Sequence, residues 1–159
     1  MLGAEQTDEG TGMLSRRGAL GGIAAAAATV LGGCGLRGED VSAEAQEAAA
    51  AVGGVTSAAL EQEVGSRFQR LLRGRIEIAE SGREAGLAVY DEAMRAVVTV
   101  VHDRLDDQTA RRMQVGGITG VLADGTELDA LELDPDMPVE DPRLDRVSAG
   151  AFYARYGLG

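Results

Sequence analysis

The chain of 159 residues holds few side chains that could do chemistry, because it contains one His, one Cys and no Lys beside its 15 Arg. His102 is the one side chain whose ordinary pKa lies near neutrality, and Asp103 and Asp106 follow it closely. A His and an acid could form a general base for a Ser or Thr nucleophile in a small hydrolase. A cationic His near the end of a helix is also simply stabilising. Because catalytic triads are defined by geometry and not by adjacency, we interpret His102 as structural, with the hydrolase as the alternative.

Two clusters of acidic side chains could offer oxygen ligands to a hard cation. Neither cluster has the alternating ligands and the Gly of a calcium-binding loop, so we interpret both as solvated loop charges and expect no metal site. One Cys and one His are too few for an internal disulfide, a redox pair or a zinc cluster. The clusters consist of Asp103, Asp106 and Asp107, and of Asp134, Asp136, Glu140 and Asp141.

The densest basic group lies in residues 67–75. We interpret it as a strand face whose arginines balance an acidic surface, since exposed ion pairs are common and weak. The alternative is a site that binds a phosphate, a lipid headgroup or an acidic glycan. A net charge of −11 excludes a general nucleic-acid binder, and Phe68 is the one aromatic side chain among these arginines. A phosphate-binding loop of the Walker type requires Lys, so the glycines at 116, 117 and 120 do not form one and we expect no cofactor. The basic group consists of Arg67, Arg70, Arg73 and Arg75, with Arg111 and Arg112 as further candidates.

Three of the five aromatic side chains lie in the last eight residues of the chain: Phe152, Tyr153 and Tyr156. So much apolar area predicts that this tail packs back onto the domain. The alternative is a docking peptide for an envelope protein partner, since Tyr and Arg are enriched at interface hot spots.

The most specific feature is the segment 13–34, MLSRRGALGGIAAAAATVLGGC. Arg16 and Arg17 precede 16 uncharged residues, a stretch somewhat short for a membrane-spanning helix. The stretch ends in Leu31, Gly32, Gly33 and Cys34, where small residues can enter a peptidase cleft and the Cys thiol can be alkylated. This sequence resembles the signal peptide and lipobox of bacterial lipoprotein precursors. The arginine pair resembles a twin-arginine export motif, from which it departs at Ala19.

The resemblance implies export, lipid attachment to Cys34 and cleavage before it, with the mature protein anchored at the extracytoplasmic face of the cell membrane. Residues 1–12 carry three acids and no cation, so we expect translation to start at Met13. The chain from Cys34 onward has 13 Arg and 23 acidic residues, a net charge of −10. Anionic lipid headgroups repel such a surface, which predicts a domain held off the membrane.

The predicted organisation is a signal peptide at 1–33, a lipidated Cys with a flexible tether at 34–52, and one domain at 53–159. Alternating apolar residues predict strands at 55–64 and 72–78, joined as a hairpin with Phe68 in the core near its turn. Ser81 and Glu84 fit a capping box for a helix that continues to Leu105.

After an acidic loop, the Asp124-Gly125 dipeptide predicts a second hairpin from strands at 113–123 and 126–133, although the spacing of Leu128 and Leu131 also allows a helical turn. Three prolines mark an irregular loop, and residues 144–156 predict a short helix that Gly157 ends. The expected fold class is α+β, with one main helix packed on a small antiparallel or mixed sheet.

These features together predict a lipid-anchored, non-enzymatic binding or interaction module of the cell envelope. The alternatives are the hydrolase that uses His102 and a structural component that recruits a membrane complex through its aromatic tail.

Overall fold

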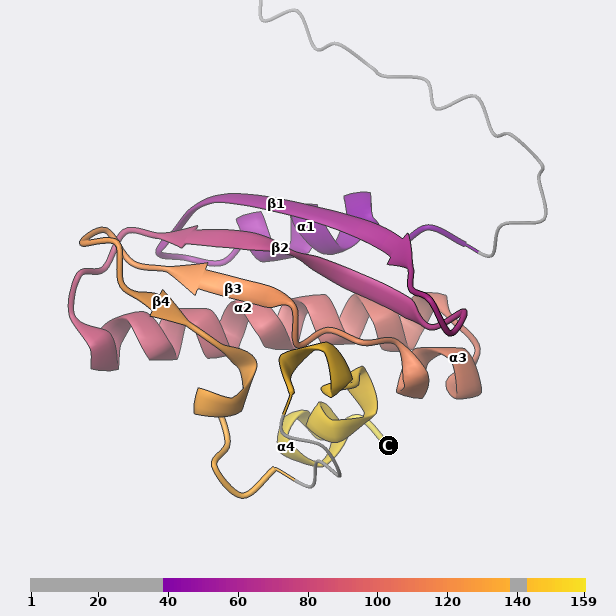
Figure 1. Cartoon of the computed structure of the whole chain (residues 1–159). Helices are drawn as coiled ribbons and strands as arrows, with labels where there is room; N and C mark the ends of the chain where they lie inside the picture. Colours follow the sequence, from indigo (N-terminus) through magenta and orange to yellow (C-terminus); the bar gives the residue numbers. More distant parts are fainter. Residues whose placement is uncertain (1–38, 138–142) are drawn as a thin grey trace, which may run out of the picture. The chain divides into compact units, whose positions relative to one another are not determined.

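The computed structural model describes residues 39–137 and 143–159 (Figure 1). The chain divides into a unit of Met1–Gly35 and a unit of Leu36–Gly159, and all the described residues belong to the second. The signal segment, its arginine pair and Cys34 lie outside the described residues. Within the described ranges, no helix is both long and apolar enough to cross a membrane.

A four-stranded mixed sheet forms the centre of the domain, in the order β1-β2-β3-β4 (Figure 1). Its strands are β1 (Val55–Val64), β2 (Arg70–Ile78), β3 (Ile118–Val121) and β4 (Glu127–Leu128). The pairs β1–β2 and β3–β4 are antiparallel, and the central pair β2–β3 is parallel. A parallel pair requires a crossover, which here contains the main helix. The predicted α+β architecture of two hairpins separated by a helix is confirmed.

Two helices, α1 (Ser42–Ala50) and α2 (Arg83–Arg104), pack on one face of this sheet and against each other (Figure 1). The apolar stripe of α2 meets the alternate residues Leu72, Ile76 and Ile78 of β2 in one core. Each such side chain, once buried, contributes roughly 1.5–3 kcal/mol. The buried residues of the stripe are Tyr90, Met94, Val97, Val98 and Val101.

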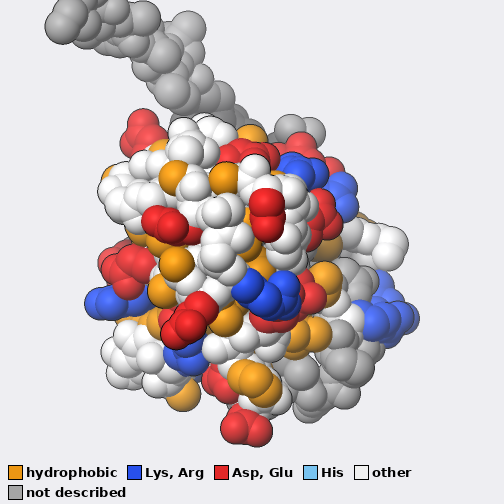
Figure 2. All heavy atoms as spheres, turned by 90° about the vertical axis from the view of Figure 1, so that its left-hand side faces the viewer, with side chains coloured by type: hydrophobic (Ala, Val, Ile, Leu, Met, Phe, Trp, Pro, Cys, Tyr) orange, Lys and Arg blue, Asp and Glu red, His pale blue; other side chains and the backbone are white. Residues whose placement is uncertain are grey.

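The opposite face of the sheet is charged and open to solvent. Arg73 pairs with Glu63 and lies 3.7 Å from Glu61, and Arg75 lies 3.5 Å from Glu77 and 3.6 Å from Glu127. Exposed pairs of this kind stabilise a fold only weakly, so the face is a solvated surface. Arg73 and Arg75 therefore have the balancing role that the sequence predicts for this basic group. Figure 2 shows the end of the domain where β2 and β3 finish, with acidic and Arg side chains interspersed across it.

The predicted tether to residue 52 is wrong over the segment that forms α1. Val41, Ala45 and Ala49 are buried, so this segment belongs to the domain core. Ala residues one turn apart leave room for close approach to α2 and β1, and this packing stabilises a helix that would be marginal alone. The folded domain thus begins before the predicted boundary at 53.

Three local predictions around the first hairpin and α2 need correction. Phe68 is exposed and not in the core, since it lies in the β1–β2 turn at the rim of a cavity that α3 also lines. Gly82, not Ser81, is the N-cap of α2, and no side chain caps this end. The predicted acidic loop contains a helix, α3 (Asp107–Arg112). Asp106 caps α3 by accepting a 3.0 Å hydrogen bond from the Thr109 N–H. Hydrogen bonding to Thr109 lowers the pKa of the Asp106 carboxyl.

The second hairpin forms at the predicted dipeptide but with shorter strands. The Thr126 N–H donates to the Asp124 carboxylate over 2.9 Å, and Gly125 has a φ of 86°. Leu131 lies in the 3₁₀ helix η1 (Ala130–Glu132), so the helical alternative holds at that point. The chain ends in two further 3₁₀ helices, η2 (Leu144–Arg146) and η3 (Ala149–Phe152), and in α4 (Tyr153–Tyr156), which Gly157 ends in a left-handed conformation.

Candidate anion-binding site

A cavity of about 400 Å³ opens at the β1–β2 turn. One side of it is the turn and the start of β2, and the other side is α3 and the link from α3 to β3. We call this cavity the turn cavity. It is lined by Arg67, Phe68, Gln69 and Arg70 from the first side and by Thr109, Arg112, Met113 and Gln114 from the second.

Backbone hydrogen bonds fix the two sides of the turn cavity to each other. The Gln114 N–H donates to the Arg70 carbonyl over 2.9 Å, and the Leu72 N–H donates to the Gln114 carbonyl over 2.8 Å. Gln114 therefore continues the parallel pairing of β2 and β3 beyond the regular strand. This pairing places the last turn of α3, which carries Arg112, next to the first residue of β2.

Three arginines of the turn cavity, Arg67, Arg70 and Arg112, form no ion pair or side-chain hydrogen bond within the described residues. Two acids close to them along the chain are engaged by other arginines, because Glu63 pairs with Arg73 and Asp107 with Arg111 over 2.8 Å. An Arg guanidinium keeps its charge at all physiological pH values. The turn cavity is therefore a positive site on a chain whose net charge is −11.

Gln114 also lines this basic cavity. Its Nε2 donates to the Arg112 carbonyl over 2.8 Å, while its Oε1 is buried and has no hydrogen-bond partner in the described part of the chain. A buried acceptor without a partner is costly and unusual. Of the six arginines that the sequence marks as candidates, four in residues 67–75 and the pair at 111 and 112, only Arg67, Arg70 and Arg112 line the cavity.

The neighbourhood of His102 differs from a catalytic triad. His102 Nδ1 lies 2.7 Å from Asp103 Oδ1, and no Ser or Thr hydroxyl bonds to the ring among the described residues. The ring stands edge-on to Tyr153, with ring centroids 5.3 Å apart, and the Arg111 guanidinium lies 4.7 Å above the same tyrosine ring. Asp106, the other acid of the predicted pair, caps α3. His102 thus contacts the C-terminal segment, which fits the structural interpretation.

The aromatic tail packs inside the domain, as the leading prediction had it. Phe152 and Tyr153 are buried, and Phe152 stacks on Tyr156 with ring centroids 5.5 Å apart. In this conformation Phe152 and Tyr153 are therefore not available to a partner. The alternative prediction, in which all three aromatic residues form an exposed docking peptide, does not describe this conformation.

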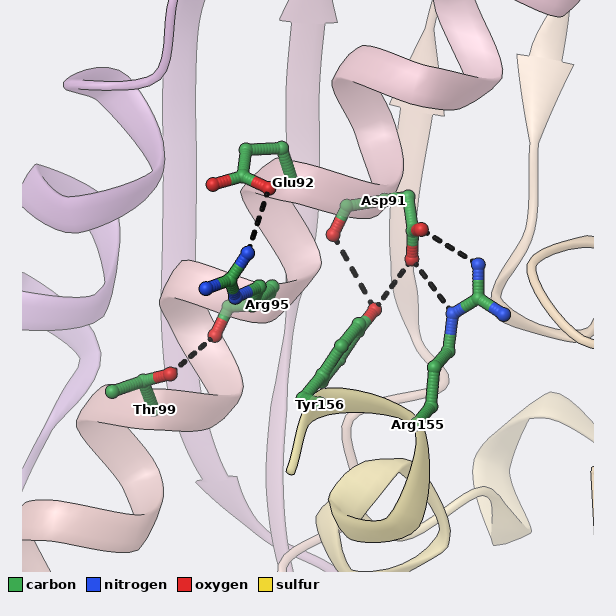
Figure 3. A network of polar contacts seen from close by, with 6 residues as sticks. All are labelled: Asp91, Glu92, Arg95, Thr99, Arg155 and Tyr156. Carbon is green, nitrogen blue, oxygen red and sulfur yellow. Dashed lines mark hydrogen bonds and ion pairs between the residues drawn. The ribbon is translucent and has the colours of Figure 1, made fainter. Parts of the chain in front are cut away.

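Asp91 of α2 holds this tail through hydrogen bonds to Arg155 and Tyr156 (Figure 3). Both of its carboxylate oxygens accept from Arg155, over 3.0 Å from Nε and 2.6 Å from Nη2, and the Tyr156 hydroxyl donates to one of them over 2.8 Å. Burial and this carboxylate raise the pKa of Tyr156, and the hydrogen bond to Asp91 raises the pKa of Arg155. Next along α2, Glu92 and Arg95 form a looser pair at 3.4 Å.

The acidic clusters do not converge in the described residues, where no three His, Cys, Asp or Glu side chains are placed to hold a metal ion. Asp103 contacts His102, and Asp107 pairs with Arg111. Asp134 accepts from the Asp136 N–H over 3.0 Å, while Glu140 and Asp141 lie outside the described residues.

Neither a protein-family model, nor a curated protein, nor a solved structure matches this chain.

Proposed function

We propose that this protein is a lipid-anchored, non-enzymatic binding module of the cell envelope and that its turn cavity binds an anionic ligand. The observation that carries the binding part is that Arg67, Arg70 and Arg112, all without an acidic partner in the described residues, line one cavity. The anchoring part rests on the lipobox-like sequence that ends at Cys34.

Electrostatics supports an anionic ligand. Three like charges around one cavity repel one another, and no acidic side chain in the described residues forms an ion pair with them. A phosphate or carboxylate in the cavity would relieve this repulsion and can accept paired hydrogen bonds from the planar guanidinium groups. A small phosphate ester such as glycerol phosphate offers this chemistry.

Titration calorimetry with sn-glycerol 3-phosphate tests the binding part on the full chain carrying Cys34→Ser. We expect saturable binding that weakens at high salt and that the triple variant Arg67→Gln, Arg70→Gln, Arg112→Gln abolishes. The matched control removes three arginines that are paired elsewhere: Arg75→Gln, Arg83→Gln, Arg95→Gln. If both triple variants bind equally weakly, only the overall charge matters and the proposed site is wrong.

Mass spectrometry of the protein isolated from membranes tests the anchoring part. We expect a mature chain that begins at a diacylglycerol-modified Cys34, and a non-lipidated product from the Cys34→Ala variant. A membrane-bound, lipid-labelled product of the Cys34→Ala variant would contradict the anchor.

A further inference from the structure

We propose that the β1–β2 turn is a membrane-docking tip, which seats the domain on the anionic headgroup layer of the same membrane that holds the lipid of Cys34. Phe68 enters the headgroup layer, and the arginines of the turn cavity bind lipid phosphates. This inference rests on the proposed function and names its ligand: the phosphate of an anionic phospholipid within a bilayer.

The apolar side chains at this tip are the first observation. In the described part of the chain, the exposed large hydrophobic side chains are Val64, which is 67% exposed, and Phe68, which is 91% exposed. Val64 is the last residue of β1, and Phe68 lies four residues further on in the turn. Aromatic and aliphatic side chains beside basic ones are the composition of surfaces that bury a few ångströms into the headgroup layer. The basic partners here are Arg67, Arg70 and Arg112.

The conformation of Phe68 is the second observation. Its φ of 58° lies in the left-handed region, which is costly for a residue with a Cβ. Two backbone bonds hold it there: the Phe68 N–H donates to the Gly65 carbonyl over 3.0 Å, and the Gly65 N–H donates to the Gln69 carbonyl over 2.8 Å. The turn thus holds an aromatic ring out in solvent in a strained conformation that serves no packing within the domain.

The point where the tether joins the domain is the third observation. The Val41 N–H donates to Gln62 Oε1 over 3.2 Å, and Gln62 Nε2 donates to the Glu39 carbonyl over 3.3 Å. Gln62 lies two residues before the end of β1, so the described chain begins at the end of the sheet that carries the tip (Figure 1). The five residue steps from Cys34 to Glu39 span at most about 18 Å. A lipid on Cys34 would therefore tie the bilayer to within about 18 Å of Glu39, at the end of the sheet that carries the tip.

The charge distribution is the fourth observation, and it sets the orientation. On the elements around the tip, Glu61 and Glu63 pair with Arg73, Asp107 with Arg111, and Glu44 with Arg104, whereas Glu39, Asp40 and Asp106 form no ion pair in the described part of the chain. An anionic surface attracts the three cavity arginines, which no acid pairs with, and repels the acids of the rest of the domain. A domain held off the membrane would be expected only if its net negative charge were spread evenly over its surface. Each arginine near an anionic surface favours docking about fivefold, and three of them about a hundredfold.

The chain has no Trp, so the variant Phe68→Trp carries one fluorophore at the tip. The lipidated protein is reconstituted in vesicles of phosphatidylcholine with roughly 30% phosphatidylglycerol, so that the vesicle surface carries a strong negative potential. We expect blue-shifted emission and quenching by brominated lipids, both lost in pure phosphatidylcholine and at high salt. The control Ser81→Trp, which places the fluorophore in the exposed loop before α2, should stay unquenched.

Adding Arg67→Gln, Arg70→Gln and Arg112→Gln to Phe68→Trp should lower the docking equilibrium about a hundredfold, with far-UV circular dichroism checking the fold. If the indole of the Phe68→Trp variant remains exposed to solvent on a correctly lipidated protein, the docking tip is refuted and the anchor stays intact. A protein that lacks lipid on Cys34 refutes the proposed function instead. If glycerol phosphate binds the turn cavity while the indole is never quenched, the ligand is a free phosphate and the docking tip is wrong.

Discussion

The contact that fastens the C-terminal segment to α2 offers a sharp energetic test. Arg155 gives Asp91 two charge-assisted hydrogen bonds, and the two side chains are 32% and 30% exposed. A charge-assisted hydrogen bond is worth about 1.5–3 kcal/mol when buried, whereas exposed ion pairs are worth below about 1 kcal/mol. For a pair that is one-third exposed we expect a coupling energy of about 1.5 kcal/mol.

The two single substitutions should differ, because Asp91 has a second partner. Arg155→Ala removes the ion pair and should lower the free energy of unfolding by about 1.5 kcal/mol. Asp91→Ala also removes the acceptor of the Tyr156 hydroxyl, so the loss should reach about 2.5 kcal/mol. The double variant should be no less stable than Asp91→Ala alone. The double-mutant cycle then isolates the energy of the ion pair.

Urea unfolding followed by far-UV circular dichroism measures all four proteins of this cycle. A neighbouring pair on the same helix, Glu92 and Arg95, supplies the matched control (Figure 3). Its side chains are 59% and 57% exposed and lie 3.4 Å apart, so its coupling should stay below about 0.5 kcal/mol. Equal coupling energies for the two pairs would refute the reasoning that burial and paired geometry make the Asp91 contact the stronger one.

Four further outcomes follow from individual residues. Gly74→Ala should unfold the domain or cost more than about 3 kcal/mol in a urea titration, because its Cβ would lie 1.9 Å from the Ala59 carbonyl oxygen, whereas Gly53→Ala, with open space around it, should change little. Phe68→Gly should raise the free energy of unfolding by about 1 kcal/mol by relieving the left-handed φ, and should weaken vesicle docking; a loss of stability would show that Phe68 packs within the domain. Burial, with Asp129 and Glu132 nearby, raises the pKa of Tyr90 in the folded state. The free energy of unfolding should therefore keep its whole Tyr90 contribution below the unfolded pKa of about 10 and fall above it by about 1.4 kcal/mol per pH unit. Tyr90→Phe should remove that part of the slope in a pH series of urea titrations. His102→Ala should leave glycerol phosphate binding unchanged and lower stability modestly through the lost contact with Tyr153, while abolition of a hydrolase activity in the purified protein would favour the enzyme alternative.

The sequence predicted the large periodic elements well. The apolar stripe from Tyr90 to Val101 forms the buried side of α2, so its helical spacing reports directly on the core. The strand predicted at 55–64 matches β1, where the alternation marks a strand although Leu60 is its one buried residue.

The errors fall where distant contacts decide the outcome. Nothing in the local pattern of Ala45 and Ala49 shows that a helix of small residues fills the space between β1 and α2. Phe68 is apolar like a core residue, but the backbone conformation of the turn, with a φ of 58° at this residue, leaves its side chain in solvent. In the sequence Asp106 has the pattern of a loop charge, because its role as the N-cap of α3 depends on a hydrogen bond from the Thr109 N–H.

The candidate site shows the same division. The basic composition of the turn is visible in the sequence, and so is the second pair of arginines at 111 and 112. The sequence does not show which arginines remain unpaired, because that depends on the ion pairs of Glu63 with Arg73 and of Asp107 with Arg111. The parallel pairing that continues to Gln114, which places Arg112 beside Arg70, also joins segments more than 40 residues apart.

The packing of α1 has one more consequence, which concerns self-association. β1 is an edge strand of ten residues, and such a strand offers free backbone groups to other chains. Gln46 of α1 accepts from the Leu60 N–H over 3.1 Å, and Gln62 Oε1 accepts from the Val41 N–H, so the segment before the sheet occupies part of that edge. A protein cut at residue 53 would uncover the edge together with the apolar groove that Ala45 and Ala49 fill. Such a protein should form intermolecular strand pairs, so α1 should be the element that keeps neighbouring copies of the domain from joining edge to edge.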